Sequence, residues 1–198
     1  MDRTDLPPRP DPQTGKPRPP AAPRDFTGRD KDLAWNTWFA PRAPPGRGPR
    51  LEQHKESRRG GIITTVVFLV IMAGWATLMS LGFDWMTQLW SWAIVLGVPA
   101  ASYIFSRGAN CAVGADWFAN GPRWVDLYEL LTVTIQMKPL QGRQLRLIDQ
   151  NHRKVTIMLE EAQRNPELWN LVYNGIRHSV ANGAHSNALV DSVLKQYR

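Results

Sequence analysis

The longest apolar stretch of the chain, residues 61–106, shows no polar stripe at helical spacing and carries a single charge, Asp84. At that charge it divides into two segments, residues 61–83 and 85–105, interrupted only by Thr, Ser and one Gln. Because an α-helix rises about 1.5 Å per residue, each segment is long enough for a hydrocarbon core of about 30 Å. Helices that are apolar all round are typical of membrane spans. The pattern predicts a transmembrane helical hairpin, and a buried hairpin of a soluble protein is the alternative.

The residues between the two segments predict a tight turn. Gly82 suits the end of the first helix, and Asp84 can accept hydrogen bonds from the free N–H groups that begin the second. Trp85, Trp90 and Trp92 follow within two helical turns, and tryptophan is enriched at membrane–water interfaces. We expect these three tryptophans to be membrane-interface anchors.

Basic residues flank the hairpin asymmetrically. Six lie just before its first segment, none lies between the segments, and Arg107 follows the second. The positive-inside rule therefore predicts a multi-pass protein of the cell inner membrane with both termini in the cytoplasm. Basic residues beside a membrane attract anionic lipids, at about 1 kcal/mol each. The six expected anionic-lipid contacts are Arg42, Arg47, Arg50, Lys55, Arg58 and Arg59.

Residues 107–198 change to a period of two, which is typical of β-strands with one buried face. Val133, Ile135 and Met137 alternate with polar side chains, and Asn120-Gly121 is typical of a hairpin turn. Turns this short connect antiparallel strands. The pattern predicts about five antiparallel strands in a small α+β domain: residues 112–118, 123–129, 131–138, 144–148 and 154–160.

Helical spacing returns near the C-terminus. Asn165-Pro166 is a capping residue followed by proline at the first helical position, and Asn182-Gly183 suits the helix end. We expect this amphipathic helix to lie on the sheet. A second helix is expected over residues 186–197, with Leu189 and Val193 facing inward.

Residues 1–60 contain twelve of the sixteen prolines and are expected to be a disordered cytoplasmic arm. Short pieces such as "PPRP" and "KPRPP" resemble ligands of SH3-type domains. One segment differs, because Leu33, Trp35, Trp38 and Phe39 place aromatic rings on one face of a short helix. This aromatic motif could lie at the membrane surface, dock on the C-terminal domain, or bind a groove of a partner.

The formal charge of +7 lies largely in this arm. A nucleic-acid module would concentrate its charge on a folded face, so the distribution disfavours nucleic acid as a partner. The lone cysteine, Cys111, excludes an intrachain disulfide and is expected to be a small buried side chain.

No nucleotide-binding glycine loop, Gly-x-Ser-x-Gly elbow or His-Glu-x-x-His pair occurs in the sequence. We therefore expect no enzymatic activity, no cofactor and no metal site. Asp149 and Asn151 alternate as at the start of a calcium loop, but a hairpin turn is the simpler interpretation. Asp126 and Glu129 are expected on solvated faces or at strand ends.

The segments "GADWFANGPRWVDLYEL", "LRLIDQNHRKVTIML" and "NPELWNLVYNGIRHSV" are similar to uncharacterised two-span membrane proteins of actinobacteria. Strands followed by one amphipathic helix resemble the bacterial pleckstrin-homology-like (PH-like) fold. The resemblance covers roughly residues 108–183. It implies a scaffold or ligand-docking module at the membrane face, and it carries over no catalytic residue.

The leading hypothesis is a non-enzymatic inner-membrane scaffold or accessory subunit. It would present the cytoplasmic domain to a larger secretion, conjugative-transfer or cell-envelope complex. The alternatives are a lipid-headgroup-binding regulator and a holin-like membrane-permeabilising protein. Membrane lipids and a protein partner are the expected contacts. Small residues in the hairpin also permit homo-oligomerisation.

Overall fold

The computed structural model describes residues 6–26, 41–55, 58–80, 82–106, 110–138 and 142–195. The chain forms two compact units, one of residues 1–55 and 110–198 and one of residues 56–109. The second unit is an insertion between two neighbouring strands, since Lys55 and Asn110 are partners in one sheet. Below, the two are called the α+β unit and the hairpin unit.

The first sheet of the α+β unit holds the two ends of that insertion. Its four strands are antiparallel and follow one another in chain order. The predicted strand over residues 112–118 is in fact two strands, because the chain turns between them and Gly114 N donates to Trp117 O at 2.9 Å. The polar first strand was not predicted. The strands are β1 (Glu52–Lys55), β2 (Asn110–Val113), β3 (Trp117–Asn120) and β4 (Arg123–Asp126).

The second sheet contains the remaining strands in the order β7-β6-β5-β8. All its pairs are antiparallel except β5 with β8, which is parallel. Val133 and Ile135 are buried as predicted, but Met137 is 67% exposed, because β5 extends past the core. The strands are β5 (Leu130–Lys138), β6 (Gly142–Asp149), β7 (Lys154–Met158) and β8 (His185–Ser186). The prediction of about five strands was therefore too low.

Three helices complete the unit: α3 (Leu159–Gln163), α4 (Pro166–Ala181) and α5 (Ala188–Lys195). The predicted start of α4 is confirmed, because the Asn165 side chain accepts hydrogen bonds from the N–H groups of Glu167 and Leu168. Gly183, at a φ of 98°, follows its last turn. In α5 the buried residue is Val190, whereas Leu189 is 42% exposed, so that part of the prediction was wrong.

The core lies between the two sheets and α4. α4 comes close to the chain at Leu127, since a Cβ at Gly175 would meet Leu127 Cβ at 2.6 Å. Cys111 is 1% exposed, which confirms its expected burial. The largest fully buried side chains are Trp117, Trp169, Phe118, Leu127, Leu145, Leu147, Leu159, Leu168 and Leu171.

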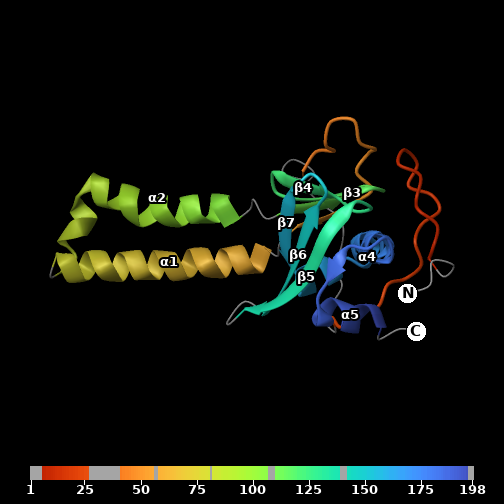
Figure 1. Ribbon diagram of the computed structural model, residues 1–198. Helices are drawn as coiled ribbons and strands as arrows, with labels where there is room; N and C mark the ends of the chain where they lie inside the picture. The colour runs from red at the N-terminus through yellow and green to blue at the C-terminus, as the bar shows by residue number, and fades with distance from the viewer. Residues whose placement is uncertain are drawn as a thin grey trace. The chain divides into compact units, whose positions relative to one another are not determined.

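The N-terminal arm differs from its predicted disorder, because its described parts pack on the α+β unit (Figure 1). Trp117 Nε1 donates to Gly48 O at 3.0 Å, which places that segment over the outer face of the first sheet. A Cβ on Gly48 would meet Pro12 O at 1.7 Å, so the two parts of the arm also touch. Ala22 and Leu51 pack against the core. Burial against a preformed domain supplies the apolar contacts that the arm lacks by itself.

The hairpin unit contains α1 (Arg58–Met79), a 3₁₀ helix η3 (Asp84–Thr87) and α2 (Leu89–Ser106). Gly82 N donates to Thr77 O at 3.1 Å and closes the end of α1. Asp84 was predicted to cap the second long helix, but it starts η3, and α2 begins only at Leu89.

Over the described residues, no helix combines the length and apolar character that crossing a membrane requires. The predicted transmembrane hairpin, its multi-pass inner-membrane localisation and the cytoplasmic placement of the termini are therefore wrong. The predicted spans were too long because they included the turn. The chain from Ser80 to Gln88 lies outside both long helices, and α2, with 18 residues, reaches about 27 Å. α1 begins on two arginines, so its apolar part is shorter than the helix.

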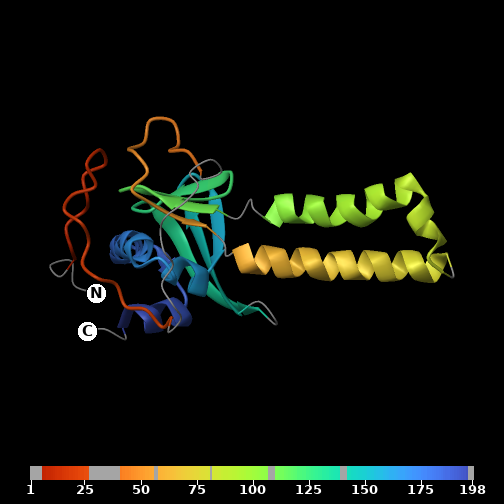
Figure 2. The ribbon, with the colours of Figure 1, turned by 180° about the vertical axis from the view of Figure 1, so that it is seen from behind.

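The two long helices lie side by side (Figure 2) and contact each other. On α2 the buried side chains form one stripe, called the seam, which repeats every four residues at Ser91, Val95 and Pro99. Around the rest of both helices large apolar side chains are exposed, including Val70 at 63% and Leu78 at 68%. Among its described side chains, the hairpin unit thus buries one stripe and leaves large apolar side chains exposed.

Candidate functional site

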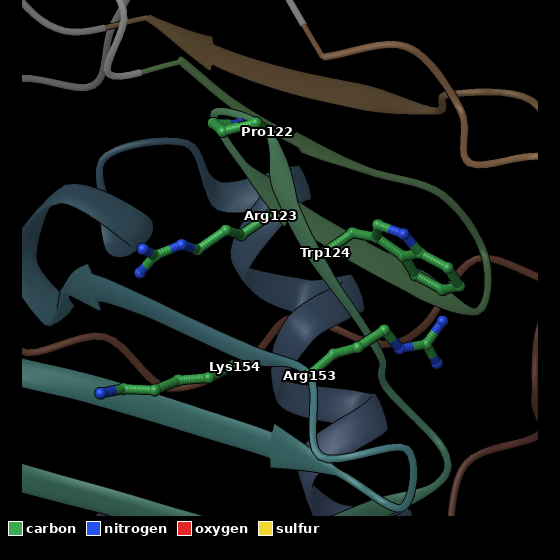
Figure 3. A pocket seen from close by; sticks show the side chains of 5 residues that line it. All are labelled: Pro122, Arg123, Trp124, Arg153 and Lys154. Atoms are coloured by element: carbon green, nitrogen blue, oxygen red, sulfur yellow. The ribbon is translucent and has the colours of Figure 1, made fainter.

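Two hairpin turns of the α+β unit border a hollow of about 480 Å³ (Figure 3). The β3–β4 turn contains Gly121, which adopts a φ of 60°, and the β6–β7 turn contains His152, at 58°. Asn120 Nδ2 donates to Thr156 O at 2.8 Å and joins the first sheet to β7. The hollow is lined by Pro122, Arg123, Trp124, Arg153 and Lys154.

Asp149 organises the β6–β7 turn, as its predicted role in a hairpin requires. The carboxylate is fully buried. One oxygen accepts from the backbone N–H groups of Asn151 and Arg153, both at 3.0 Å. The other accepts from Asp126 N at 3.1 Å and from Arg153 Nε at 2.7 Å. These four hydrogen bonds fix the conformation of the β6–β7 turn and thereby the position of Arg153.

Arg153 is held over an aromatic ring. Its guanidinium carbon lies 3.5 Å from the centre of the Trp124 ring, and Arg47 lies 5.6 Å from the same centre. Figure 3 shows the Arg153 side chain pointing to Trp124. Stacking and the ion pair with Asp149 together fix the guanidinium, so Trp124 and Arg153 form a preorganised wall of the hollow.

Arg47 neutralises two carboxylates beside this wall. It pairs with Asp116 at 2.6 Å and also with Asp126. Burial would lower the pKa of Arg47, but the hydrogen bonds and charges of the two carboxylates outweigh it and raise that pKa. Asp126, expected on a solvated face or at a strand end, is the last residue of β4 and is 2% exposed, so the strand-end alternative is confirmed. The buried acids are therefore compensated by Arg47 and Arg153.

Arg123 and Lys154 are the excess positive charges of the hollow. Both are exposed, and Figure 3 shows them extending in the same direction, away from Trp124. Within the described residues neither forms an ion pair with a carboxylate. Arginine and lysine beside an aromatic wall can bind an anion such as a phosphate group. No group of three or more His, Cys, Asp or Glu side chains suited to a metal occurs in the described part of the chain.

The predicted basic residues are not gathered at one place. Arg42 is exposed and lines a second hollow of about 400 Å³, which shares Pro122 and Trp124 with the first. Arg47 forms ion pairs with Asp116 and Asp126 within the α+β unit. Arg50 is half-buried. The backbones of the remaining three belong to the end of β1 and the start of α1: Lys55, Arg58 and Arg59.

The three tryptophans predicted as interface anchors have different surroundings. Trp85 is 6% exposed, and its Nε1 donates to Thr77 Oγ1 at 3.0 Å. Trp92 Nε1 donates to Met86 O at 3.0 Å. Trp90 is 64% exposed. The first two indole N–H groups therefore stabilise the turn of the hairpin.

The aromatic motif, Leu33, Trp35, Trp38 and Phe39, lies outside the described residues. The residues around the first hollow, in contrast, were missed by the sequence reasoning. Their signal was a basic residue next to each of two turns, Arg123 and Arg153. These two basic residues can be recognised as parts of one site only when β4 and β7 are known to be neighbours.

Comparison of this chain with protein-family models, with curated proteins and with solved structures gave no match. The resemblance to actinobacterial membrane proteins with a PH-like domain stays a prediction.

Proposed function

We propose that the protein is a non-enzymatic scaffold subunit, which assembles with further copies through the hairpin unit and displays the α+β unit. The observation that carries this proposal is the exposed apolar surface of α1 and α2. Among the described side chains, the large exposed apolar ones all belong to the hairpin unit except Leu131, Met137 and Leu189. Contiguous apolar surfaces of this kind mark interaction sites.

The shape of the two helices favours other copies of the chain as the partner that covers the exposed apolar surface of α1 and α2. Gly74 and Gly97 leave open places in the helix surfaces, since nothing lies within 4 Å of a Cβ built on either. Small residues allow helices to approach closely. A largely apolar hairpin is complementary to a second copy of itself, because the exposed apolar side chains of α1 and α2 can cover those of another copy.

Light scattering of the purified full chain tests the proposal. We expect stable oligomers, and Gly74→Leu should raise the dissociation constant by about tenfold or more, equivalent to about 1.4 kcal/mol. A Cβ at Gly74 meets no atom of the described chain within 4 Å, so we attribute the effect of the substitution to contact between chains. Leu189→Ser, on the α+β unit, is the matched control and should leave assembly unchanged.

Two results would contradict assembly through the hairpin. One is a monomer at micromolar concentration that shows no tendency to associate. The other is a chain that floats with lipid vesicles as a monomer, because the lipid would then cover the surface assigned to other copies.

The first hollow supports a second candidate function, the recognition of a phosphate group by a regulator. Its support is the pair of exposed cations, Arg123 and Lys154, next to the fixed Trp124–Arg153 wall. A soluble inositol phosphate and vesicles carrying a phosphoinositide offer the same chemistry from two sources. Binding to both would indicate recognition of the phosphate group, and binding to vesicles alone would indicate recognition of the lipid surface.

The matched variants separate this hollow from general charge. Arg123→Gln combined with Lys154→Gln should weaken binding by about tenfold or more and reduce its salt dependence. Arg143→Gln removes a positive charge on β6 that already pairs with Asp25 and Glu160, so it should have little effect on binding. Equal losses in both variants would contradict a specific hollow.

A further inference from the structure

The proline-rich arm folds back on itself beside α4. Asp11 N donates to Lys16 O and Gly15 N donates to Asp11 O, both at 2.8 Å. Gly15 has a φ of 66°, which suits the turn. Both limbs of this loop contact α4, as the distances below show, and the red segment lies beside that helix in Figures 1 and 2.

α4 supplies the hydrogen-bond donors that a proline-rich chain requires. Proline has no N–H, so its carbonyl oxygens are the groups that a binding surface can recognise. His178 Nε2 lies 2.7 Å from Pro7 O. Trp169 Nε1 donates to Pro23 O at 2.6 Å. Donors at both ends of the contact thus hold carbonyls of both limbs.

The same side of α4 carries aromatic rings and polar side chains at regular helical spacing. Asn170, Asn174 and His178 recur every four residues, and each is at most 8% exposed. The Trp169 and Tyr173 rings lie 5.7 Å apart and extend the surface. Aromatic grooves with interspersed donors are how proline-rich segments are recognised in general. The α4 face is defined here as these five residues and Tyr128.

An arginine of the arm lies on this face. The Arg9 guanidinium carbon is 4.8 Å from the centre of the Tyr128 ring, and Arg9 Nε lies 3.5 Å from His178 Nδ1. Burial raises the pKa of Tyr128 to about 12, so its hydroxyl stays neutral and accepts from Asn174 Nδ2 at 3.1 Å. The face therefore accepts an arginine as well as prolines.

The arm does not fill the α4 face completely. A cavity of about 110 Å³ remains between the prolines of the arm and residues such as Tyr173 and Asn174. Asn174 is 2% exposed, and its Oδ1 has no hydrogen-bond partner in the described structure. A buried acceptor without a partner is costly. A ligand with a backbone N–H at this place would satisfy Asn174, which the prolines of the arm cannot do.

We propose that the α4 face is a recognition surface for proline-rich, arginine-containing segments, and that residues 7–23 occupy it as an intramolecular ligand. A proline-rich segment of a partner protein displaces the arm and binds the same donors. The "PPRP" piece of the sequence is thus a ligand of its own chain. The α4 face is a different surface from the hairpin unit and the first hollow.

A labelled peptide with the sequence of residues 6–26 tests the proposal by fluorescence anisotropy. In the full-length wild type the arm competes with the peptide. In an arm variant the competition is removed, and we expect the dissociation constant to fall by about tenfold or more. A peptide with every proline replaced by alanine should not bind. The arm variant carries Pro7→Ser, Pro8→Ser, Pro19→Ser, Pro20→Ser and Pro23→Ser.

Two tryptophan variants assign the binding to the α4 face. Trp169→Phe, added to the arm variant, keeps a ring but removes the N–H donor, so affinity should fall by about tenfold or more. Trp124→Phe, in the first hollow, should leave binding unchanged. Equal affinity of wild type and arm variant, or unchanged affinity after Trp169→Phe, would overturn the proposal.

A second measurement uses the otherwise native chain. Ala22 N donates to Asn170 Oδ1 at 2.7 Å, so hydrogen exchange of this amide reports whether the arm is docked. Saturating unlabelled peptide should accelerate its exchange by about tenfold or more, as should Asn170→Ala. Unchanged exchange at saturating peptide would overturn displacement of the arm even if the arm variant failed to fold.

Discussion

The α+β unit and the hairpin unit use the same apolar residue types but bury them very differently. In the α+β unit apolar side chains alternate with polar ones along the strands, and the apolar ones are nearly all in the core. In the hairpin unit the helices are apolar all round, so a two-helix contact covers one seam only. Among the described residues, Trp85 and Val95 are its only buried large apolar side chains.

The difference teaches that the period of the pattern decides what a chain can bury by itself. A period of two or an amphipathic helix divides the side chains into one face for the core and one for water. A segment without a polar face has no such division, and a large apolar surface that it leaves exposed marks an interaction site. Among the described residues, the α+β unit therefore buries most of its large apolar side chains, whereas the hairpin unit leaves most of its own exposed.

The largest expected effect comes from placing one substitution in each unit. Leu147 is fully buried on β6, whereas Leu78 is 68% exposed on α1. Leu147→Ala leaves a cavity and should reduce the free energy of unfolding of the α+β unit by about 2–5 kcal/mol. Leu78→Ala should change the stability of the isolated chain by less than about 0.5 kcal/mol. Hydrogen exchange, followed separately for peptides of each unit, measures both.

Similar losses of hydrogen-exchange protection after Leu147→Ala and Leu78→Ala would contradict this difference between the two units. A large loss of protection in α1 after Leu78→Ala would mean that the side chain is buried in solution. Such a result at low protein concentration would show cover by something other than a second copy.

Glycine to alanine should change stability with opposite sign in the two units. A Cβ at Gly175 would lie 2.6 Å from Leu127 Cβ and 3.1 Å from Leu127 O. Gly175→Ala should therefore destabilise the α+β unit by about 1–2 kcal/mol, because overpacking outweighs the gain in helix propensity. A Cβ at Gly74 meets no atom of the described chain within 4 Å, so Gly74→Ala should stabilise α1 of the dissociated chain by about 0.5–1 kcal/mol.

Urea denaturation of the Gly175→Ala chain and hydrogen exchange of α1 peptides in the Gly74→Ala chain give the two values. Stabilisation by Gly175→Ala would show that α4 can move away from Leu127. Destabilisation by Gly74→Ala at a concentration where the chains are dissociated would show that the open place on α1 is filled within the chain itself.

Local signals in the sequence were sufficient for much of the α+β unit. The turn at Asn120-Gly121 and the start of α4 at Asn165-Pro166 depend on residues a few positions apart, and both predictions are confirmed. Capping and turn chemistry act over short range, so they can be predicted without knowledge of the fold.

Long-range contacts could not be predicted in this way. The polar strand Glu52–Lys55 exists because β2, beyond the insertion, pairs with it. The packing of Gly48 on Trp117 depends on the finished sheet. Arg123 and Arg153 border one hollow because two sheets meet there. Apolar content, in turn, predicted where the hairpin lies but overestimated the length of its helices.

Buried charge is confined to the α+β unit among the described side chains, and Arg47 tests its contribution. Arg47→Lys keeps the charge but cannot bridge Asp116 and Asp126 with a planar guanidinium. We expect the free energy of unfolding to fall by about 1–2 kcal/mol, as for lost hydrogen bonds to charged groups. Urea denaturation gives the value. Arg42→Lys, at an exposed position, is the control, and an equal change in both variants would contradict the bridge.

The smallest expected effect is a dependence of arm docking on pH. Burial lowers the pKa of His178, as do the charges of Arg9 and Arg177, while the hydrogen bond to Pro7 O opposes the shift. Since the pKa of the folded state lies below the unfolded value of about 6.5, the unfolded chain binds the proton first. Stability is therefore complete above about pH 6.5 and falls as the pH decreases below it.

Hydrogen exchange of Ala22 at pH 7.5 and pH 5.5, corrected for the intrinsic exchange rate, measures this dependence. The wild type should show weaker protection at the lower pH. His178→Gln keeps a donor for Pro7 O but does not titrate, so its protection should change less between the two pH values. If both chains lost protection equally, another group would control the arm. A dependence confined to the wild type would show that His178 links protonation to the exposure of the α4 face. The described side chains of the hairpin seam include no histidine, so they offer no comparable control by pH.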